Sequence, residues 1–228
     1  MNWMKKVAVA LVCLLPLGLQ AAKVDTLQVK SPSMNKSIEV VVVSPDVAAT
    51  KACPVIYLLH GYGGNARTWV GIKPDLSKIA DEKGIFFVCP DGKNTWYWDS
   101  PLNADVRYET FISDELVKYV DSHYKTVADR KGRAITGLSM GGHGAMWNGL
   151  RHSDVFSAAG STSGGVDIRP FPKNWEMSVQ IGEKAKYPEN WEKYTVINLV
   201  PTLRKDQIAL IFDCGDSDFF LEVNKNYH

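Results

Sequence analysis

The chain has 228 residues, which is enough for one sizeable α/β domain and makes two compact domains a less expected arrangement. Hydrophobic residues make up 45% of the chain and charged residues 22%, as is ordinary for a globular protein. The net charge is +1, and no long basic run occurs, so composition indicates neither nucleic acid nor an acidic macromolecule as a partner.

The segment Met1–Ala22 has the pattern of a cleaved signal peptide. Lys5 and Lys6 precede an apolar stretch, Val7–Leu19, which is shorter than the ~20 residues needed to span a bilayer. Small residues follow at the expected cleavage point. We therefore expect an exported protein, secreted or periplasmic, with one domain at 23–228 and no membrane attachment after cleavage.

The cysteines of the expected mature chain are Cys53, Cys89 and Cys214, an odd number. Each lies in or beside an apolar, strand-like run, so buried free thiols are the first expectation. One disulfide plus one thiol is the alternative, because export allows disulfides to form. No spacing resembles a zinc site, and no pattern indicates a metal or a cofactor.

In the first half of the domain, β-branched and apolar runs predict strands and amphipathic spacing predicts helices. The expected strands are Lys23–Lys30, Ser37–Ser44, Val55–Leu59 and Ile85–Cys89, and the expected helices are Pro74–Lys83 and Tyr108–Tyr124. The two central runs are continuously apolar, as is typical of strands buried on both faces of a parallel sheet.

The second half continues the alternation of strand and helix. A buried strand at 133–137 leads into a helix from about Gly141 to Arg151, and short strands follow at Val155–Gly160 and Gln207–Phe212. Between those strands, Asp167–Lys205 is polar, rich in prolines and aromatic, and we expect it to lie over the active-site end of the sheet. The pattern predicts a mostly parallel sheet with helices on both faces, which binds ligands at the carboxyl ends of its strands.

The sequence Gly137-Leu138-Ser139-Met140-Gly141 matches the G-x-S-x-G nucleophile elbow. In such an elbow the serine occupies a strained turn between a strand and a helix, and glycines on either side avoid collisions with neighbouring backbone. The alternative is a glycine-rich turn with an incidental serine. His60–Gly64, Asp91–Asn103 and Asp213–Asp218 also follow expected strands, and this shared edge favours an α/β-hydrolase fold.

Six motifs, in this order along the chain, resemble the esterase D family. That family includes S-formylglutathione hydrolases, bacterial tributyrin esterases, and feruloyl and acetyl-xylan esterases. The motifs are Leu59–Gly64, Asn94–Asp99, Tyr108–Phe111, Gly137–Gly142, Arg151–Phe156 and Asp213–Phe220. The resemblance covers the chain from about Val24 to its end, and it implies a serine esterase that needs no cofactor.

The resemblance implies a role for each of four residues. Ser139 is the nucleophile, and the backbone N–H groups of Met140 and Tyr62 form the oxyanion hole. Asp218 is the catalytic acid that the family motif indicates. Asp216 remains an alternative, and Asp213 is expected to brace the turn.

The catalytic base is missing from the expected position. In this fold the histidine follows the acid by roughly 30 residues, whereas the sequence has only His228, ten residues after Asp218. We expect a chain that lacks its last strand, last helix and catalytic histidine, with impaired hydrolysis and poor solubility. Asn224–His228 resembles the middle of a helix. Of the other histidines, His60 is expected to brace the glycine loop that follows the first central strand, and His143 to point away from Ser139. His123 is expected at the end of a surface helix and His152 in a loop before a strand.

Aromatic residues are concentrated in the loops at the active-site end. Trp96, Tyr97 and Trp191 are predicted to contact substrate, together with Trp98 and Trp175 at the rim, and loop anchoring is the alternative. Export disfavours a glutathione thioester and favours small acyl esters, or acetyl and feruloyl groups on polysaccharide. An acyltransferase of the same fold and a non-catalytic carbohydrate-binding derivative are the alternative functions.

Overall fold

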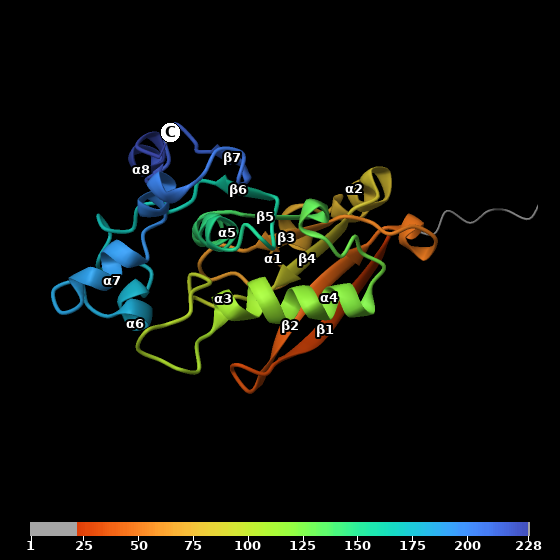
Figure 1. Ribbon diagram of the computed structural model, residues 1–228, viewed down its shortest axis with the longest axis horizontal. Coiled ribbons are helices and arrows are strands. Elements are labelled where there is room, and N and C mark those ends of the chain that lie inside the picture. The colour runs from red at the N-terminus through yellow and green to blue at the C-terminus, as the bar shows by residue number, and fades with distance from the viewer. Residues whose placement is uncertain (1–21, 228) are drawn as a thin grey trace, which may run out of the picture.

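The computed structural model describes residues 22–227 (Figure 1). The expected signal peptide therefore lies outside the described residues, apart from its last position, Ala22, and His228 lies outside them as well. Among the residues described, no helix is both long enough and apolar enough to cross a bilayer.

A seven-stranded sheet organises the domain, in the order β1-β2-β4-β3-β5-β6-β7. Strands β4, β3, β5, β6 and β7 are mutually parallel, whereas β1 and β2 form an antiparallel hairpin that joins β4. The strand bounds are β1 Lys23–Ser31, β2 Lys36–Ser44, β3 Val55–Leu59, β4 Phe86–Pro90, β5 Arg133–Gly137, β6 Ala158–Thr162 and β7 Ala209–Asp213. The mostly parallel sheet predicted from the alternating pattern is confirmed.

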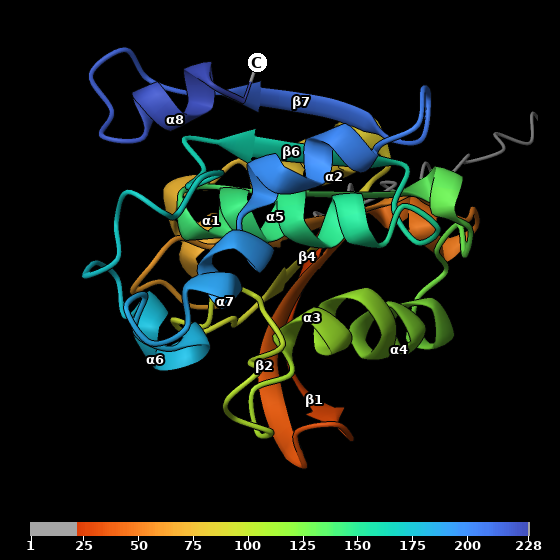
Figure 2. The same cartoon turned by 60° about the vertical axis from the view of Figure 1, so that its left-hand side comes forward.

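Helices cover both faces of this sheet (Figures 1 and 2). Helices α1 (Thr68–Ile72) and α2 (Leu76–Lys83) pack on one face with the smaller apolar cluster. The larger cluster lies under α5 (Met140–Arg151) and a continuous helical segment on the other face. That segment consists of α3 (Tyr108–Thr110), a π-helical turn (Phe111–Glu115) and α4 (Leu116–His123).

The remaining helices are short. They are α6 (Met177–Ile181), α7 (Pro188–Lys193), α8 (Leu221–Lys225) and the 3₁₀ turns at Asp46–Ala49, Arg130–Gly132 and Val196–Thr202. The predicted excursion at 167–205 contains α6, α7 and the last of these turns. Helix α8 ends at Lys225, so of the segment predicted as the middle of a helix, Asn224 and Lys225 form its last residues and 226–227 form a turn.

The strand predicted at Val155–Gly160 begins later, at Ala158. The amides of Val155 and Phe156 both donate to the carbonyl of His152, which closes the turn after α5 rather than a strand ladder. Phe156 is buried against Tyr57, with the ring centroids 5.7 Å apart. Its apolar character therefore reflects burial in a turn, and this explains the misplaced strand boundary.

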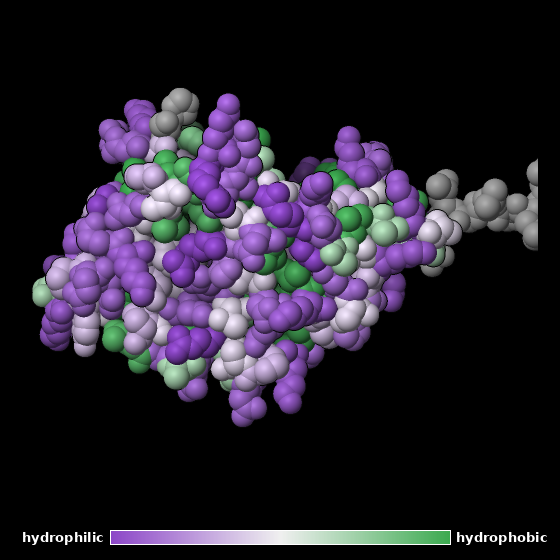
Figure 3. Space-filling model, in the orientation of Figure 1, coloured by the Kyte–Doolittle hydropathy of each residue, from purple (hydrophilic) through white to green (hydrophobic). Residues whose placement is uncertain are grey.

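The two edges of the sheet differ in chemistry. Strand β1 carries Lys23 and Lys30 among its exposed residues, as is common for edge strands that avoid pairing with other chains. Strand β7 has exposed apolar residues instead, among them Ile211, whose exposed fraction is 74%. The surface in Figure 3 is mostly hydrophilic, with hydrophobic residues visible in places, including the end of the molecule that holds β7 and α8.

Candidate active site

Ser139 lies at a sharp turn between β5 and α5. Its φ of 54° and ψ of −118° are strained for a residue with a side chain, and strain of this kind is concentrated at functional sites. The surrounding backbone holds it in place, since the Ser139 amide donates to the Thr162 carbonyl on β6 at 2.9 Å. The side chain is half-buried. The elbow conformation predicted from the five-residue motif is present.

The glycines on either side of Ser139 have no room for a side chain. A Cβ at Gly137 would lie 2.8 Å from the carbonyl oxygen of Leu59, and one at Gly141 would lie 2.7 Å from that of His60 and closer still to Leu59. These are backbone atoms of β3 and the residue after it, which cannot rotate away. The elbow therefore depends on direct contact between α5 and the end of the neighbouring strand.

The loop after β3 lies directly beside the serine. A Cβ at Gly61 would be 3.5 Å from the Cβ of Ser139. Within residues 22–227, neither the amide of Met140 nor that of Tyr62 donates to a protein acceptor. Met140 is also the first residue of α5, where the helix dipole favours negative charge. The arrangement is suited to stabilising an oxyanion next to Ser139.

His60 braces this loop from inside the protein. Its Nδ1 is 2.8 Å from the Gly61 carbonyl, and its Nε2 accepts the Gly92 amide at 2.9 Å. Asp91 lies beside it: burial disfavours its ionisation, but the hydrogen bonds and the charge of Lys93 outweigh this and hold the pKa of Asp91 to about 2.

Tyr62 and Gly63 form the tip of the loop. The Gly63 amide donates to the side-chain oxygen of Asn94 at 2.9 Å, and the Asn94 amide donates to Glu176 at 3.2 Å. Desolvation and a hydrogen bond with Glu176 raise the pKa of Tyr62. The sequence analysis assigned no function to Asn94 or Glu176, because nothing in the local pattern indicates a contact between residues so far apart.

Asp218 follows β7 on a loop at the same end of the sheet. Its side chain accepts the Phe220 amide at 2.7 Å and is partly exposed. Asp216 is exposed and bonds only with the neighbouring Ser217 within the described residues. Asp213 is the last residue of β7, and its carbonyl accepts the Ser163 amide. The contacts favour Asp218 as the more ordered carboxylate, and its catalytic role remains a proposal.

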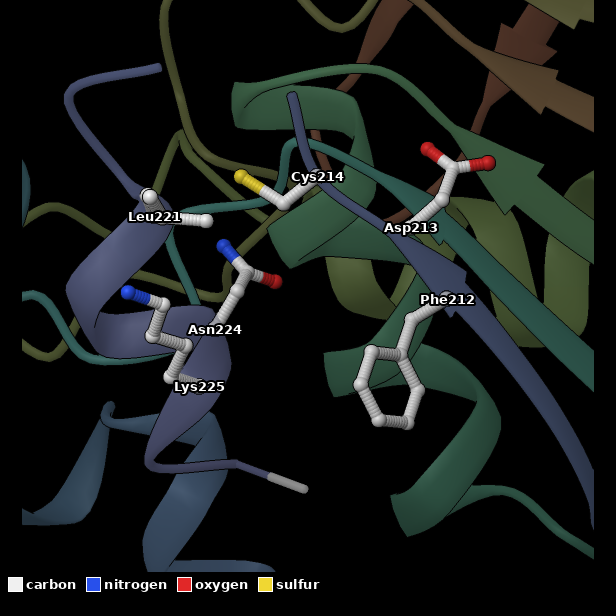
Figure 4. Close-up of a pocket in the computed structure, with 6 residues that line it drawn as sticks. All are labelled: Phe212, Asp213, Cys214, Leu221, Asn224 and Lys225. Carbon is white, nitrogen blue, oxygen red and sulfur yellow. The ribbon is translucent and has the colours of Figure 1, made fainter. Parts of the chain in front are cut away.

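A pocket of about 390 Å³ lies between β7 and α8, next to this acidic loop (Figure 4). Phe212 of β7 and Asn224 of α8 lie on opposite sides of it, with Cys214 above them in that view. Asn224 also donates to the Gly164 carbonyl at 2.8 Å, which joins α8 to the chain that follows β6. The pocket therefore borders the acidic loop rather than Ser139.

The four described histidines all have partners away from Ser139. His143 is fully buried, with Nδ1 at 2.8 Å from the Gly165 carbonyl and Nε2 accepting from the Trp98 indole at 2.8 Å. Burial lowers the pKa of His143 to about 4, so the ring is neutral at physiological pH. His123 bonds with the Tyr119 carbonyl, and His152 with Glu109. The His143 amide donates to the Ser139 carbonyl within the first turn of α5, but no ring of a described histidine bonds with the Ser139 side chain.

The prediction that Trp96, Tyr97 and Trp191 line the substrate site is corrected by their burial. All three side chains are enclosed, as is that of Trp98. Each uses its polar atom to bond with a backbone carbonyl: Trp96 with Trp175, Tyr97 with His60, and Trp191 with Gly182. Aromatic residues with one satisfied polar atom are good anchors for long loops. The sequence pattern identified a packed aromatic core, not the rim.

Other aromatic residues are accessible at this end. The half-buried Trp175 stacks on Phe219 at 5.3 Å between ring centroids, and Phe219 has an exposed fraction of 62%. Trp175 and the next residue, Glu176, both have positive φ values, 48° and 54°. The bond from the Trp96 indole holds this strained turn. An aromatic surface therefore lies between the loop that holds Asp218 and the turn at Trp175 and Glu176. That turn contacts the loop Gly61–Gly64 through Asn94.

The described cysteines are free thiols, and Cys53 and Cys89 are buried, as predicted, whereas Cys214 is partly exposed. Burial raises the pKa of Cys89 to about 12, which makes it unreactive. Residues 22–227 contain no group of three or more histidine, cysteine, aspartate or glutamate side chains placed to hold a metal ion.

The parallel sheet, the strained serine between β5 and α5, and the adjacent glycine loop together define the α/β-hydrolase class. The chain belongs to the family described as putative esterase, whose model matches residues 31–227.

Three similar proteins illustrate the range of the family. A Mycobacterium tuberculosis protein named as an esterase is 31% identical over 149 residues, covering 62% of this chain and 32% of its own length. An acetyl esterase of Caldicellulosiruptor saccharolyticus is 25% identical over 75% of this chain and 68% of its own. The solved structure of a ferulic acid esterase has a TM-score of 0.73 and 30% identity, covering 91% of this chain and 84% of that one. The chain thus spans about a third of the length of the mycobacterial relative.

Proposed function

We propose that the protein is a serine carboxylesterase that forms an acyl-enzyme on Ser139. The conformation of Ser139 carries this proposal, because a strained serine at the start of a buried helix needs a reason beyond packing. The Tyr62 amide of the adjacent loop and the Met140 amide at the start of α5 have no acceptor among residues 22–227, and this supports the same function. Family membership agrees with it.

In the proposed mechanism, Ser139 Oγ attacks the ester carbonyl and a tetrahedral oxyanion forms. The amides of Met140 and Tyr62 stabilise the oxyanion, each by about 3 kcal/mol in comparable enzymes. Collapse releases the alcohol, and water then attacks the acyl-enzyme to release the acid. Asp218 is the carboxylate proposed to orient the catalytic base.

The base is not one of the four described histidines, since each of them is bonded elsewhere. With residues 22–227 alone, proton transfer from Ser139 depends on solvent, and the oxyanion hole supplies the remaining acceleration.

We propose small acyl esters as the substrates, with acetyl and feruloyl groups on polysaccharide as the particular cases. The exposed ring of Phe219, stacked on the half-buried Trp175, supports an aromatic acyl or alcohol group, because rings stack well on such surfaces. The names of the acetyl and ferulic acid esterases among the similar proteins agree with this range. Export and a secreted or periplasmic location are part of the same proposal, on the basis of residues 1–22.

The test is release of p-nitrophenol from p-nitrophenyl acetate. We expect the wild-type rate to exceed that of Ser139→Ala at every substrate concentration, and we expect His228→Ala to leave the rate unchanged. Equal rates for wild type and Ser139→Ala would refute the esterase function. Retention of carbohydrate binding in that case would favour the non-catalytic alternative.

A further inference from the structure

The loop Gly61–Gly64, here called the oxyanion loop, is a tight turn. The Gly64 amide donates to the Gly61 carbonyl at 3.0 Å, and Gly63 has a φ of 76°, as in the third position of a type II turn. A type II turn differs from a type I turn mainly in the orientation of its central peptide, here the one between Tyr62 and Gly63. Something must therefore hold that peptide in place.

The first two peptides of the turn, Gly61–Tyr62 and Tyr62–Gly63, are held from different sides. The carbonyl of Gly61 is held by the Gly64 amide and by His60, and because a trans peptide is planar, the Tyr62 amide points the opposite way. Among residues 22–227, the central peptide is held by the bond from its Gly63 amide to Asn94 Oδ1 at 2.9 Å. A Cβ at Gly63 would meet no atom within 4 Å, so packing does not hold the tip of the loop.

Asn94 is in turn fixed by Glu176. Its Nδ2 donates to Glu176 Oε2 at 3.2 Å, so the amide has both of its ends occupied and a defined orientation. Glu176 belongs to the strained turn at Trp175, which the Trp96 indole holds through a 3.1 Å bond.

We propose that Asn94, fixed by Glu176, is a positioning residue for the oxyanion hole. It holds the central Tyr62–Gly63 peptide, which keeps the turn closed, so that the Tyr62 amide of the preceding peptide stays directed at the reacting carbonyl. It touches neither the substrate nor Ser139. The inference rests on the proposed function for its catalytic consequence, but the hydrogen bond from Gly63 is a property of the fold and can be measured without any substrate.

The first measurement is amide hydrogen exchange by NMR. In wild type we expect the Gly63 amide to be protected, and in Asn94→Ala we expect it to exchange at least tenfold faster. Asn103→Ala is the matched control, because the Asn103 side chain accepts the Asp105 amide at 2.9 Å in the same way, at the other end of the same loop. That variant should leave Gly63 protected.

The second measurement is the rate at which a fluorophosphonate modifies Ser139. We expect Asn94→Ala to slow this reaction by about tenfold to a hundredfold, with an unchanged melting temperature, because a misplaced loop weakens the transition state and not the fold. Asn94→Asp should be slow as well, since two carboxylates would then face each other. In the double variant Asn94→Asp/Glu176→Gln, the amide and the carboxylate exchange places, so the hydrogen bond between the two positions is restored with its donor at position 176. We expect this variant to recover most of the rate.

The outcomes separate the two proposals. Rapid exchange of the Gly63 amide in wild type, or full reactivity in Asn94→Ala, would overturn the role of Asn94. Failure of the double variant to recover while Asn94→Ala is slow would overturn the role of Glu176. Loss of Gly63 protection in Asn94→Ala, together with a wild-type Ser139 that does not react, would contradict the proposed esterase function and leave the positioning of the loop confirmed.

Discussion

Replacing Gly141 with alanine tests how far the elbow depends on contact between backbones. Helix propensity alone predicts that Gly→Ala within a helix stabilises the protein by about 1 kcal/mol. At Gly141 the added Cβ would lie 2.7 Å from the His60 carbonyl oxygen and 2.5 Å from the Leu59 carbonyl carbon. Overpacking against atoms that cannot rotate away costs about 3 kcal/mol. We therefore expect a net loss of about 2 kcal/mol in the free energy of unfolding.

Gly71→Ala is the matched control. Gly71 is also helical, in α1, but a Cβ there would meet no atom within 4 Å. Only the propensity term applies, so we expect a gain of about 0.5–1 kcal/mol. For a domain of this size, about 1 kcal/mol changes the melting temperature by 2–4 °C. Gly141→Ala should thus melt about 4–8 °C below wild type, and Gly71→Ala slightly above it.

Differential scanning calorimetry and urea titration measure both changes. A Gly141→Ala variant that is as stable as wild type, and whose Ser139 still reacts with a fluorophosphonate at the wild-type rate, would refute the reasoning. It would show that α5 can move away from β3 at little cost. A destabilised Gly71→Ala would show that helix propensity does not apply at that site.

Two further predictions concern acid stability and solubility. Because the pKa of Asp91 is held to about 2, its ionised form stabilises the fold above the ordinary pKa of aspartate, and this is lost as pH falls through about 2. Urea unfolding between pH 4 and 2 should therefore show a loss of up to about 2 kcal/mol in wild type that is smaller in Asp91→Asn, and equal losses would contradict the assignment. Ile211→Lys places a charge on the exposed edge strand β7 and should reduce aggregation, measured by light scattering. The equivalent change at Val24 on β1, an edge that already carries charges, should have little effect, and equal improvement at both sites would argue against β7 as the cause.

The sequence predicted the fold where local pattern and tertiary environment agree. Continuous apolar runs such as Val55–Leu59 identified the central parallel strands with their bounds. The G-x-S-x-G motif identified the elbow, because its glycines are required by contacts that recur wherever a strand turns into a helix in this way. Val155 and Phe156 were misplaced because burial in a turn and burial in a strand produce the same apolar signal.

The site was only partly predictable. Ser139, Met140 and the glycine loop follow from local motifs, but the aromatic residues did not behave as expected. Trp96 and Trp98 resemble binding residues in sequence, yet they are buried and use their indole N–H groups as internal donors. The bond between Gly63 and Asn94, and the further bond to Glu176, join segments 31 and 82 residues apart. No periodicity or short motif records pairings of that range.

The most direct test of the central claim is covalent modification of Ser139. The protein is treated with a fluorophosphonate, and the modified residue is identified by peptide mass spectrometry, with Ser139→Ala and heat-denatured wild type as controls. The account predicts one phosphonyl group on Ser139 in the folded protein and none in either control. An unmodified folded protein, or a label on any other serine, would contradict it.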